Sequence, residues 1–420
     1  MRAGITRFTL ALALAAGLCA AAGCGGAPQE PTVTILVPWS GAQLTAFLNV
    51  VQPWENGHHV LVDAEYTSSY MQQINADLQA GEPPDLVDFS EPGAVEQYEG
   101  YHDLKSLPID LGSYDQPWRS LAESSDGTVY AVPVKADVKS LIWYKTSYVK
   151  GSPTSTTWTA LERFTRTGTP WCLGLNNGGS DNGWPGADWV AEILLSADGA
   201  GTYRDWLTGT LGWESSQVMD AWQAWGRLIR YGAAVPGGAK AALGTPYASA
   251  ITTKGCGLDL SALSATGLTS TAGYNYVPFP SISGMPAPVL VSGDFMTMFT
   301  DNPNARSLLQ YLASGQAQER WVQQPGVHAF SADSEVLPSD YPRGPEQSIA
   351  DLLQPTESAT RCFSAEDIMV PDLTTAFENA ILDYVHDPNS LKSLLDGLQM
   401  TAIGKKEAKD QVAGNACGLP

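Results

Sequence analysis

The stretch that decides the fold is Thr128–Tyr144, with the sequence TVYAVPVKADVKSLIWY. From Val132 to Lys139 it alternates with a period of two, with valine and alanine on one face and proline, lysine and aspartate on the other. This pattern predicts a strand with one buried face and one face open to solvent. The run Leu141–Tyr144 is apolar without alternation, which predicts burial on both sides. A strand whose surroundings change along its length indicates a crossing between two domains.

Upstream of this stretch, strand and helix patterns alternate. Period-two apolar residues predict strands over 33–37 and 60–66, and a third strand is expected over 85–89. Ser40 precedes one helical pattern and Ser68 or Ser69 precedes another, which Gly81 and Pro83-Pro84 end. A β-α-β-α-β order predicts a parallel sheet with helices on its faces, in which ligands gather at the carboxyl ends of the strands. Here those ends are 39–41 and 90–93.

The N-terminus predicts export. Residues 1–23 hold Arg2 and Arg7 and then an apolar run from Phe8, as a secretory signal peptide does. Small residues directly precede Cys24, which resembles a bacterial lipidation site with residues 24–31 as the tether. The alternative is an ordinary cleavage site next to a cysteine. No later segment is long and apolar enough to span a bilayer.

Charge and cysteine content narrow the function. The formal net charge is −21, and removing residues 1–23, which hold two arginines and no acidic residue, makes it −23. Such a charge argues against nucleic acid and against a large anionic ligand. The four cysteines beyond Cys24 contain no C-x-x-C, which argues against zinc. Three disulfide pairings are possible outside the cytosol, and buried free thiols are the alternative. We expect Cys172–Cys256 and Cys362–Cys417, because each pair then joins one contiguous region.

Downstream of the crossing, the pattern mixes strands, loops and helices. A strand is expected over 170–175, followed by a glycine-rich loop over 177–183. A helix is expected from Asn302 to about Trp321. The last third of the chain has helical periodicity.

Three motifs carry a resemblance to a known family: VPVKADVKSLIWY at 132–144, PWCLGL with GWPGADW between 170 and 189, and GDFM at 293–296. They resemble segments of family 1 extracellular solute-binding proteins of sugar ABC transporters, of the α-glucoside type. The resemblance also implies a strand over 276–280 that returns toward the first lobe, and a loop at 293–296. Ala187 stands where relatives often have threonine. The segment Lys254–Leu258 also departs from the more aromatic or histidine-containing run of relatives.

The resemblance implies an α/β, two-lobed periplasmic-binding-protein-like fold of type II, similar to maltose-binding protein. It implies discontinuous lobes joined by a hinge: lobe 1 over 32–138 plus 286–335, and lobe 2 over 139–285 plus 336–420. The implied function is a lipid-anchored, extracytoplasmic substrate-binding component of an ABC importer, held at the outer face of the cell membrane. It would be a monomer without catalysis, cofactor or metal, whose partners are a sugar and membrane permease subunits.

A sugar site needs aromatic rings for the apolar faces of the sugar and carboxylates or amides for its hydroxyls. The candidates at expected strand ends, in loops and on the crossing stretch are Trp39, Glu91, Lys135, Asp137, Tyr144, Asp181, Trp184, Asp294 and Phe295.

Each candidate has a structural alternative. Trp184 could pack on its own lobe, Asp294 could cap a turn, and Lys135 and Asp137 could form a solvated pair. Two other functions also remain open: the same fold binding a polyamine, a glycerophosphodiester or an iron complex, and a secreted glycoside hydrolase that uses two carboxylates.

Overall fold

The computed structural model describes residues 30–67, 69–98, 101–107, 109, 111–123, 127–147, 157–166, 169–178, 182–230, 235–284, 288–354, 360–404 and 416–418. The expected signal peptide, Cys24 and nearly all of the tether lie outside these residues, as does Asp181.

Strands and helices alternate over the first part of the described chain and occur in short runs of like elements after it. The strands are β1 (Thr32–Val37), β2 (Leu61–Tyr66), β3 (Leu86–Phe89), β4 (Val132–Val138), β5 (Leu141–Lys145), β6 (Leu258–Leu260), β7 (Tyr274–Pro278), β8 (Val289–Met298) and β9 (Arg361–Phe363). The α-helices are α1 (Gly41–His58), α2 (Tyr70–Ala80), α3 (Trp118–Ala122), α4 (Trp158–Arg166), α5 (Trp184–Leu207), α6 (Ser216–Arg230), α7 (Pro303–Leu312), α8 (Gly315–Val322), α9 (Pro345–Leu353), α10 (Ala365–Ile368), α11 (Pro371–His386) and α12 (Leu391–Gly404).

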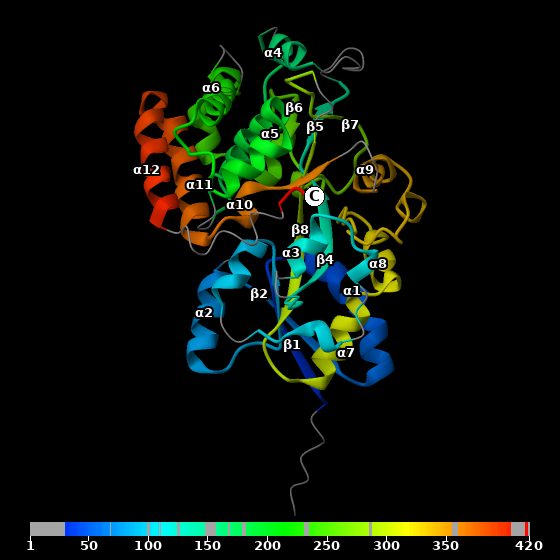
Figure 1. The fold of residues 1–420 in the computed structure, drawn as a ribbon. Helices are drawn as coiled ribbons and strands as arrows, with labels where there is room; N and C mark the ends of the chain where they lie inside the picture. The colour runs from blue at the N-terminus through cyan, green and yellow to red at the C-terminus, as the bar shows by residue number, and fades with distance from the viewer. Residues whose placement is uncertain are drawn as a thin grey trace, which may run out of the picture.

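Two sheets organise the molecule. The larger has the order β2-β1-β3-β8-β4, with β9 also pairing with β8. In it β1 runs parallel to β2 and β3, while β8 runs antiparallel to β3 and β4. The smaller sheet has the order β6-β5-β7. In Figure 1, α1, α2 and α7 lie around the larger sheet, and α4, α5, α6, α11 and α12 lie around the smaller one. The result is a two-lobed mixed α/β fold.

The predicted crossing is confirmed: β4 belongs to the larger sheet and β5, three residues later, to the smaller. The first β-α-β-α-β unit is also confirmed. Helix α1 begins after Ser40, and α2 ends at Gly81, whose φ of 74° lies in the left-handed region that glycine adopts without strain.

Three local expectations are wrong. The polar face of β4 is buried: Asp294 of β8 pairs with Lys135, and the hydroxyl of Ser264 donates to Asp137. Residues 170–175 form only isolated bridges rather than a strand, at Trp171 with Leu258 and, just beyond, at Asn176 with Pro246. The segment 293–296 is not a loop but the middle of β8, because it pairs with β3 on one side and β4 on the other.

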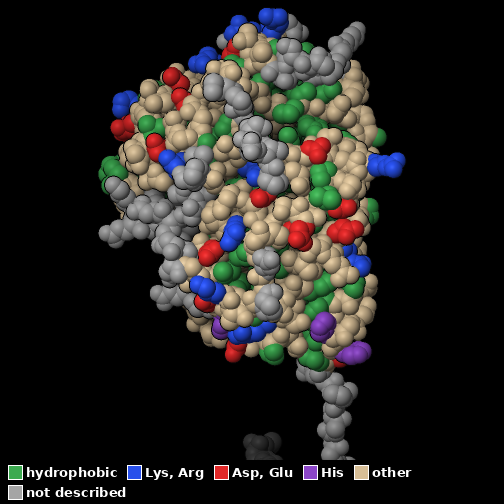
Figure 2. Space-filling model, turned by 45° about the vertical axis from the view of Figure 1, so that its right-hand side comes forward, with side chains coloured by type: hydrophobic (Ala, Val, Ile, Leu, Met, Phe, Trp, Pro, Cys, Tyr) green, Lys and Arg blue, Asp and Glu red, His purple; other side chains and the backbone are tan. Residues whose placement is uncertain are grey.

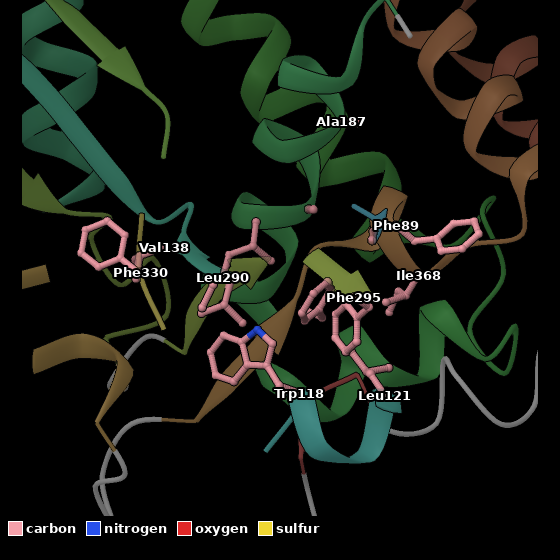
Figure 3. Packing of buried hydrophobic residues seen from close by; sticks show 14 of the residues in the cluster. Phe89, Trp118, Leu121, Val138, Ala187, Leu290, Phe295, Phe330 and Ile368 are labelled. Atoms are coloured by element: carbon pink, nitrogen blue, oxygen red, sulfur yellow. The ribbon is translucent and has the colours of Figure 1, made fainter. Parts of the chain in front are cut away.

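The hydrophobic core continues from one sheet to the other. Figure 3 shows Trp118 of α3 beside residues of β8 and α10, including Leu290, Phe295 and Ile368. The Trp118 ring also meets Phe363 of β9 edge-on, with centroids 6.4 Å apart. Each such side chain contributes about 1.5–3 kcal/mol when fully buried. Buried apolar packing therefore stabilises the junction between the lobes as well as each lobe.

The structure contains both expected disulfides, Cys172–Cys256 and Cys362–Cys417. The second joins β9 to the C-terminal residues 416–418, so the end of the described chain lies near the middle of the molecule in Figure 1.

One face of the molecule is mixed in charge. On the face shown in Figure 2, acidic and basic side chains are interspersed, and apolar side chains appear in small groups. Among the described residues, no helix has both the length and the apolar character needed to cross a bilayer.

Gly293 allows β8, β4 and α3 to approach closely, so a larger residue at this position should destabilise the fold. A Cβ at this position would lie 2.5 Å from the carbonyl oxygen of Lys135 and 2.7 Å from Nε1 of Trp118. Gly293→Ala should therefore lower the free energy of unfolding by about 1–3 kcal/mol, as overpacking does. Urea unfolding measures the change. In the control Gly397→Ala the new Cβ meets nothing within 4 Å in α12, and replacing a helix-interior glycine should stabilise by up to about 1 kcal/mol. Equal stability of Gly293→Ala and the wild type would contradict the prediction.

Candidate functional site

A cavity of about 790 Å³ lies where the two lobes meet. Segments that follow β1, β2 and β3 line it on the side of the larger sheet, at 38–40, 66–67 and 90–91. Residues 176–178, 246–248 and six residues between 262 and 269 line it on the other side. Lys135 and Asp137 of β4, Lys139 just beyond it and residues 292–294 of β8 also line it. The cavity is therefore at the carboxyl ends of the parallel strands, where the β-α-β order places ligands.

Lys135 is at the centre of a first polar cluster. Its Nζ lies 2.9 Å from Oδ2 of Asp294 and 3.4 Å from Oδ2 of Asp137. Asp294 lies opposite Lys135 in the β4–β8 register, and Asp137 is two residues along the same face of β4. Nε1 of Trp39 donates to Asp294 at 3.0 Å, and the hydroxyl of Ser264 donates to Asp137 at 2.9 Å. The cluster thus joins the loop after β1 to residues beyond β6.

Burial and the neighbouring charges together shift the pKa values of the groups in this cluster. Burial opposes the charge of Lys135, but Asp294 and Asp137 hold its pKa above the ordinary value. Burial, helped by Asp294, raises the pKa of Asp88 on β3 well above its ordinary range. Neither carboxyl oxygen of Asp88 has a hydrogen-bond partner among the described residues. Burial also raises the pKa of Asp137, although Lys135 and Ser264 lower it. Acidic groups are in excess here.

Lys139 forms a second cluster, just beyond the end of β4. Its Nζ lies 2.7 Å from Oε1 of Glu366, 3.1 Å from Oδ1 of Asp188 and 3.3 Å from Oδ2 of Asp367. The same Nζ is 5.3 Å from the centroid of the Trp184 ring, within cation–π range. Burial opposes its charge, but the acidic groups, Asp188 foremost, raise the pKa of Lys139 well above its ordinary value.

The structure brings most of the sequence candidates together. Those that line the cavity are Trp39, Glu91, Lys135, Asp137, Trp184 and Asp294. Tyr144 and Phe295 are not among the lining residues, which corrects their assignment to the site. Phe295 follows Asp294 on β8, so its side chain points to the opposite face of the strand and packs 5.9 Å from Phe363. Tyr144 is buried in β5, between β6 and β7.

Sequence reasoning missed the second cluster. Lys139 continues the alternation of Lys135 and Asp137, so the period of two already placed it on the same face. The sequence contains no pattern that relates Glu366 and Asp367 to Lys139, because α10 lies more than two hundred residues from β4 in the chain. Tyr247 was also missed; it meets Trp184 edge-on, with ring centroids 4.9 Å apart.

Ser140 and Glu192 form a buried link next to the second cluster. The Ser140 hydroxyl donates to Oε2 of Glu192 at 2.7 Å and accepts from the backbone N–H of Leu290 at 2.6 Å. Oε1 of Glu192 has no hydrogen-bond partner among the described residues. Burial raises the pKa of Glu192 to about 8, although the hydrogen bond from Ser140 opposes the shift.

Two lobes of mixed α/β structure around a polar cavity edged with aromatic rings define a solute-binding protein. Solved structures support this fold: the solute receptor AcbH, described as preferring β-D-galactopyranose, aligns with a TM-score of 0.73 at 17% identity over 90% of this chain and 100% of that one. Maltose-bound MalE3 of T. maritima aligns with a TM-score of 0.70 at 15% identity, over 89% of this chain and 99% of that one.

Sequence comparison gives the family. The family model described as "Bacterial extracellular solute-binding protein" matches residues 39–319, so the chain belongs to that family, which is a family of binding proteins and not of enzymes. The osmoprotective compounds-binding protein GgtB of Synechocystis sp. is 29% identical over 87% of this chain and 91% of its own length. The α-glucosides-binding periplasmic protein AglE of Rhizobium meliloti is 28% identical over 86% of this chain and 84% of its own length.

The raised pKa of Glu192 predicts a pH dependence of stability. Between about pH 4.5 and 8 the folded protein holds a proton on Glu192 that the unfolded chain has lost, so the free energy of unfolding falls as the pH rises. The slope from this group approaches about 1.4 kcal/mol per pH unit. Glu192→Gln removes the titration and keeps an acceptor for Ser140, so its advantage over the wild type should grow from pH 5 to pH 8. Urea unfolding at both pH values tests this.

The matched control for this experiment is Glu214→Gln, at an exposed position before α6. It should leave the difference between pH 5 and pH 8 as in the wild type. A pH profile of Glu192→Gln parallel to that of the wild type would show that Glu192 is ionised in the folded protein.

Proposed function

We propose that the protein captures a sugar, an oligosaccharide or an α-glucoside, between its lobes and delivers it to the permease of an ABC importer. One observation carries this proposal: a cavity at the strand carboxyl ends, lined from both lobes by carboxylates and by the Trp184–Tyr247 ring pair. Carboxylates accept hydrogen bonds from sugar hydroxyls, and rings cover the apolar sugar faces. The similarity to an α-glucoside-binding relative supports the same ligand class.

The proposed lobes are 32–138 plus 286–335 for lobe 1 and 139–285 plus 336–420 for lobe 2. The connections between the two sheets support hinge bending: β4 leads into β5, and β7 leads into β8. The hinge would lie at residues 138–141 and at the start of β8. Closure about these connections would bury the sugar, as hinge motions do in periplasmic binding proteins.

The proposed location is the outer face of the cell membrane, with residues 1–23 removed, Cys24 lipidated and residues 24–31 as the tether. Export fits a family described as extracellular and a chain with two disulfides. The protein would work there as a monomer, with the permease subunits as its membrane partners.

A ligand screen tests the binding proposal. The protein from residue 27 onward, exported so that its disulfides form, is melted against mono- and disaccharides, α-glucosides, polyamines, amino acids and glycerophosphodiesters. A solute at a hundredfold excess over Kd should stabilise the native state by about 2.7 kcal/mol. We expect a rise in Tm with a sugar and no cleavage of that sugar. A rise with a glycerophosphodiester alone would contradict the sugar proposal.

Trp184→Ala extends this test to the site. Loss of the ring should weaken sugar binding about tenfold or more, which corresponds to about 1.4 kcal/mol. Trp158→Ala is the matched control, because Trp158 is also partly exposed but does not line the cavity and contacts Phe279 instead. Titration calorimetry gives both affinities. Equal affinities of the two variants would remove Trp184 from the site.

Cys24→Ser tests the anchor. The wild type produced in a bacterium that lipidates exported proteins should sediment with membranes, and Cys24→Ser should be released. Mass spectrometry of the mature N-terminus checks for the acylated cysteine. An unmodified N-terminus in the wild type would show that residues 1–23 are an ordinary secretory signal.

A further inference from the structure

A buried histidine, His328, lies directly behind the cavity wall and does not itself line the cavity. We propose that His328 is a positioning residue for ligand binding. It joins two stretches of the wall, residues 267–269 and residues 326–327, and so stabilises the arrangement of the lobes that holds the ligand. This rests on the proposed function and on the proposed lobes.

Both nitrogens of the His328 ring face acceptors. Nδ1 lies 2.8 Å from Oε1 of Glu346, and Nε2 lies 2.9 Å from the backbone carbonyl oxygen of Leu268. A carbonyl oxygen only accepts, so Nε2 donates. Burial alone would raise the pKa of Glu346, but the hydrogen bond with His328 lowers it below its ordinary value, so this carboxyl accepts as well. The ring is therefore held from two sides by bonds that it donates.

The bond to Leu268 joins different parts of the molecule. Val327 lines the cavity directly before His328, and Leu268 lines it too. Two residues after His328, the carbonyl of Phe330 accepts from the backbone N–H of Ala136 on β4 at 2.8 Å. In the proposed lobes, His328 moves with lobe 1 and Leu268 moves with lobe 2. Closure of the lobes would form the bond between them, and opening would break it.

Leu268 connects this bond to the rings of the cavity. The neighbouring Gly267 has a φ of 67°, and a Cβ on it would collide with the carbonyl oxygen of Ala248. Ala248 and Tyr247 are consecutive and both line the cavity, and the Tyr247 ring meets Trp184. The two backbones are in close contact at Gly267. A displacement of Leu268 should therefore be passed to Ala248 and on to the ring pair.

The backbone of His328 also indicates a constrained position. Its φ of 50° lies in the left-handed region, which few residues other than glycine adopt. In the described part of the chain, His59 is the other non-glycine residue with a positive φ, and it ends α1. His328 ends no helix, because α8 stops at Val322. Strain of this kind persists where the surroundings hold it, and it gathers at functional sites.

Two substitutions separate the two bonds of His328. In His328→Gln the amide nitrogen reaches the place of Nε2 and keeps a donor for Leu268. In His328→Asn the shorter amide takes the place of Nδ1 and keeps a donor for Glu346. Asparagine adopts the left-handed region more readily than glutamine does, so His328→Gln should lower Tm more than His328→Asn. Ligand affinity should follow the opposite order, which a purely structural role would not produce.

The first measurement needs no ligand. Within the segment 264–269, the N–H of Thr266 donates to the carbonyl of Leu263 at 3.2 Å, and the N–H of Leu268 donates to the Thr266 hydroxyl at 3.2 Å. Hydrogen exchange read by mass spectrometry reports whether these bonds open. We expect faster exchange of this segment in His328→Asn, and exchange as in the wild type in His328→Gln.

The second measurement is affinity, by titration calorimetry with trehalose and maltose as the probes. His328→Asn should weaken the binding of a probe about tenfold or more, because the closed form then leaves the carbonyl of Leu268 unpaired. His328→Gln should bind within about threefold of the wild type. His386→Asn is the matched control, because His386 is exposed at the end of α11 and does not line the cavity. It should change neither exchange nor affinity.

The outcomes separate this inference from the sugar function. Unchanged exchange of 264–269 in His328→Asn overturns the positioning role, and so does a loss of affinity that is larger in His328→Gln. Either result leaves the sugar function standing. If neither probe binds to the wild type, that result counts against the sugar function, and exchange decides on His328 by itself. Faster exchange in His328→Asn but not in His328→Gln then supports the positioning role, and equal exchange in both variants overturns it.

Discussion

The structure depends on two lysines buried on one strand and its extension. Lys135 and Lys139 stand four residues apart on the same face, and neither is more than 8% exposed. An isolated buried charge costs several kcal/mol, so each lysine requires acidic partners. These partners come from elsewhere in the chain: Asp294 from β8, Asp188 from α5 and Glu366 from α10. Because breaking a buried pair costs about 3–5 kcal/mol, the lysines hold these elements around the cavity.

The proposed hinge lies next to these charges. The backbone N–H of Lys139 donates to the carbonyl of Leu290 at 2.8 Å, and the carbonyl of Ser140 accepts from the N–H of Phe279 at 2.8 Å. Residues 139–140 therefore contact the start of β8 and the end of the β7 segment at once. Glu192 of α5 joins the same point through the Ser140 hydroxyl. In the proposed closure, a lobe rotation would alter the bonds of Ser140 at the same time as the ion pairs of Lys139.

The local pattern of the sequence predicted the elements better than their surroundings. The alternation of 132–139 depends on neighbours in the chain, so it revealed the polar face of β4 and the change at Leu141. Whether that face met solvent depended on Asp294 and Glu366, which are more than 150 residues away and have no periodic relation to it. Asp294 was expected in a loop from the family resemblance, but it lies within β8, where the absence of a Cβ on Gly293 allows Trp118 to approach the strand closely. Both disulfides were predicted correctly by pairing the cysteines that lie in the same contiguous region of the chain.

For the aromatic residues, the sequence shows their number but not which of them face the cavity. The chain has 13 tryptophans, but most that are described are buried, and Trp39 and Trp184 line the cavity. Trp39 is 5% exposed, packs against Phe47 and Trp321, and directs its N–H to Asp294. It acts on the site mainly by orienting a carboxylate. Trp184 is half-buried beside Tyr247, so the ring surface available for stacking belongs to the lobe of the smaller sheet. The larger sheet contributes mainly carboxylates, through Asp137 and Asp294. In the proposed mechanism the rings for stacking come from one lobe and the carboxylates from both, Asp294 from one and Glu366 from the other, so a ligand gains its complete set of interactions only when the lobes close on it.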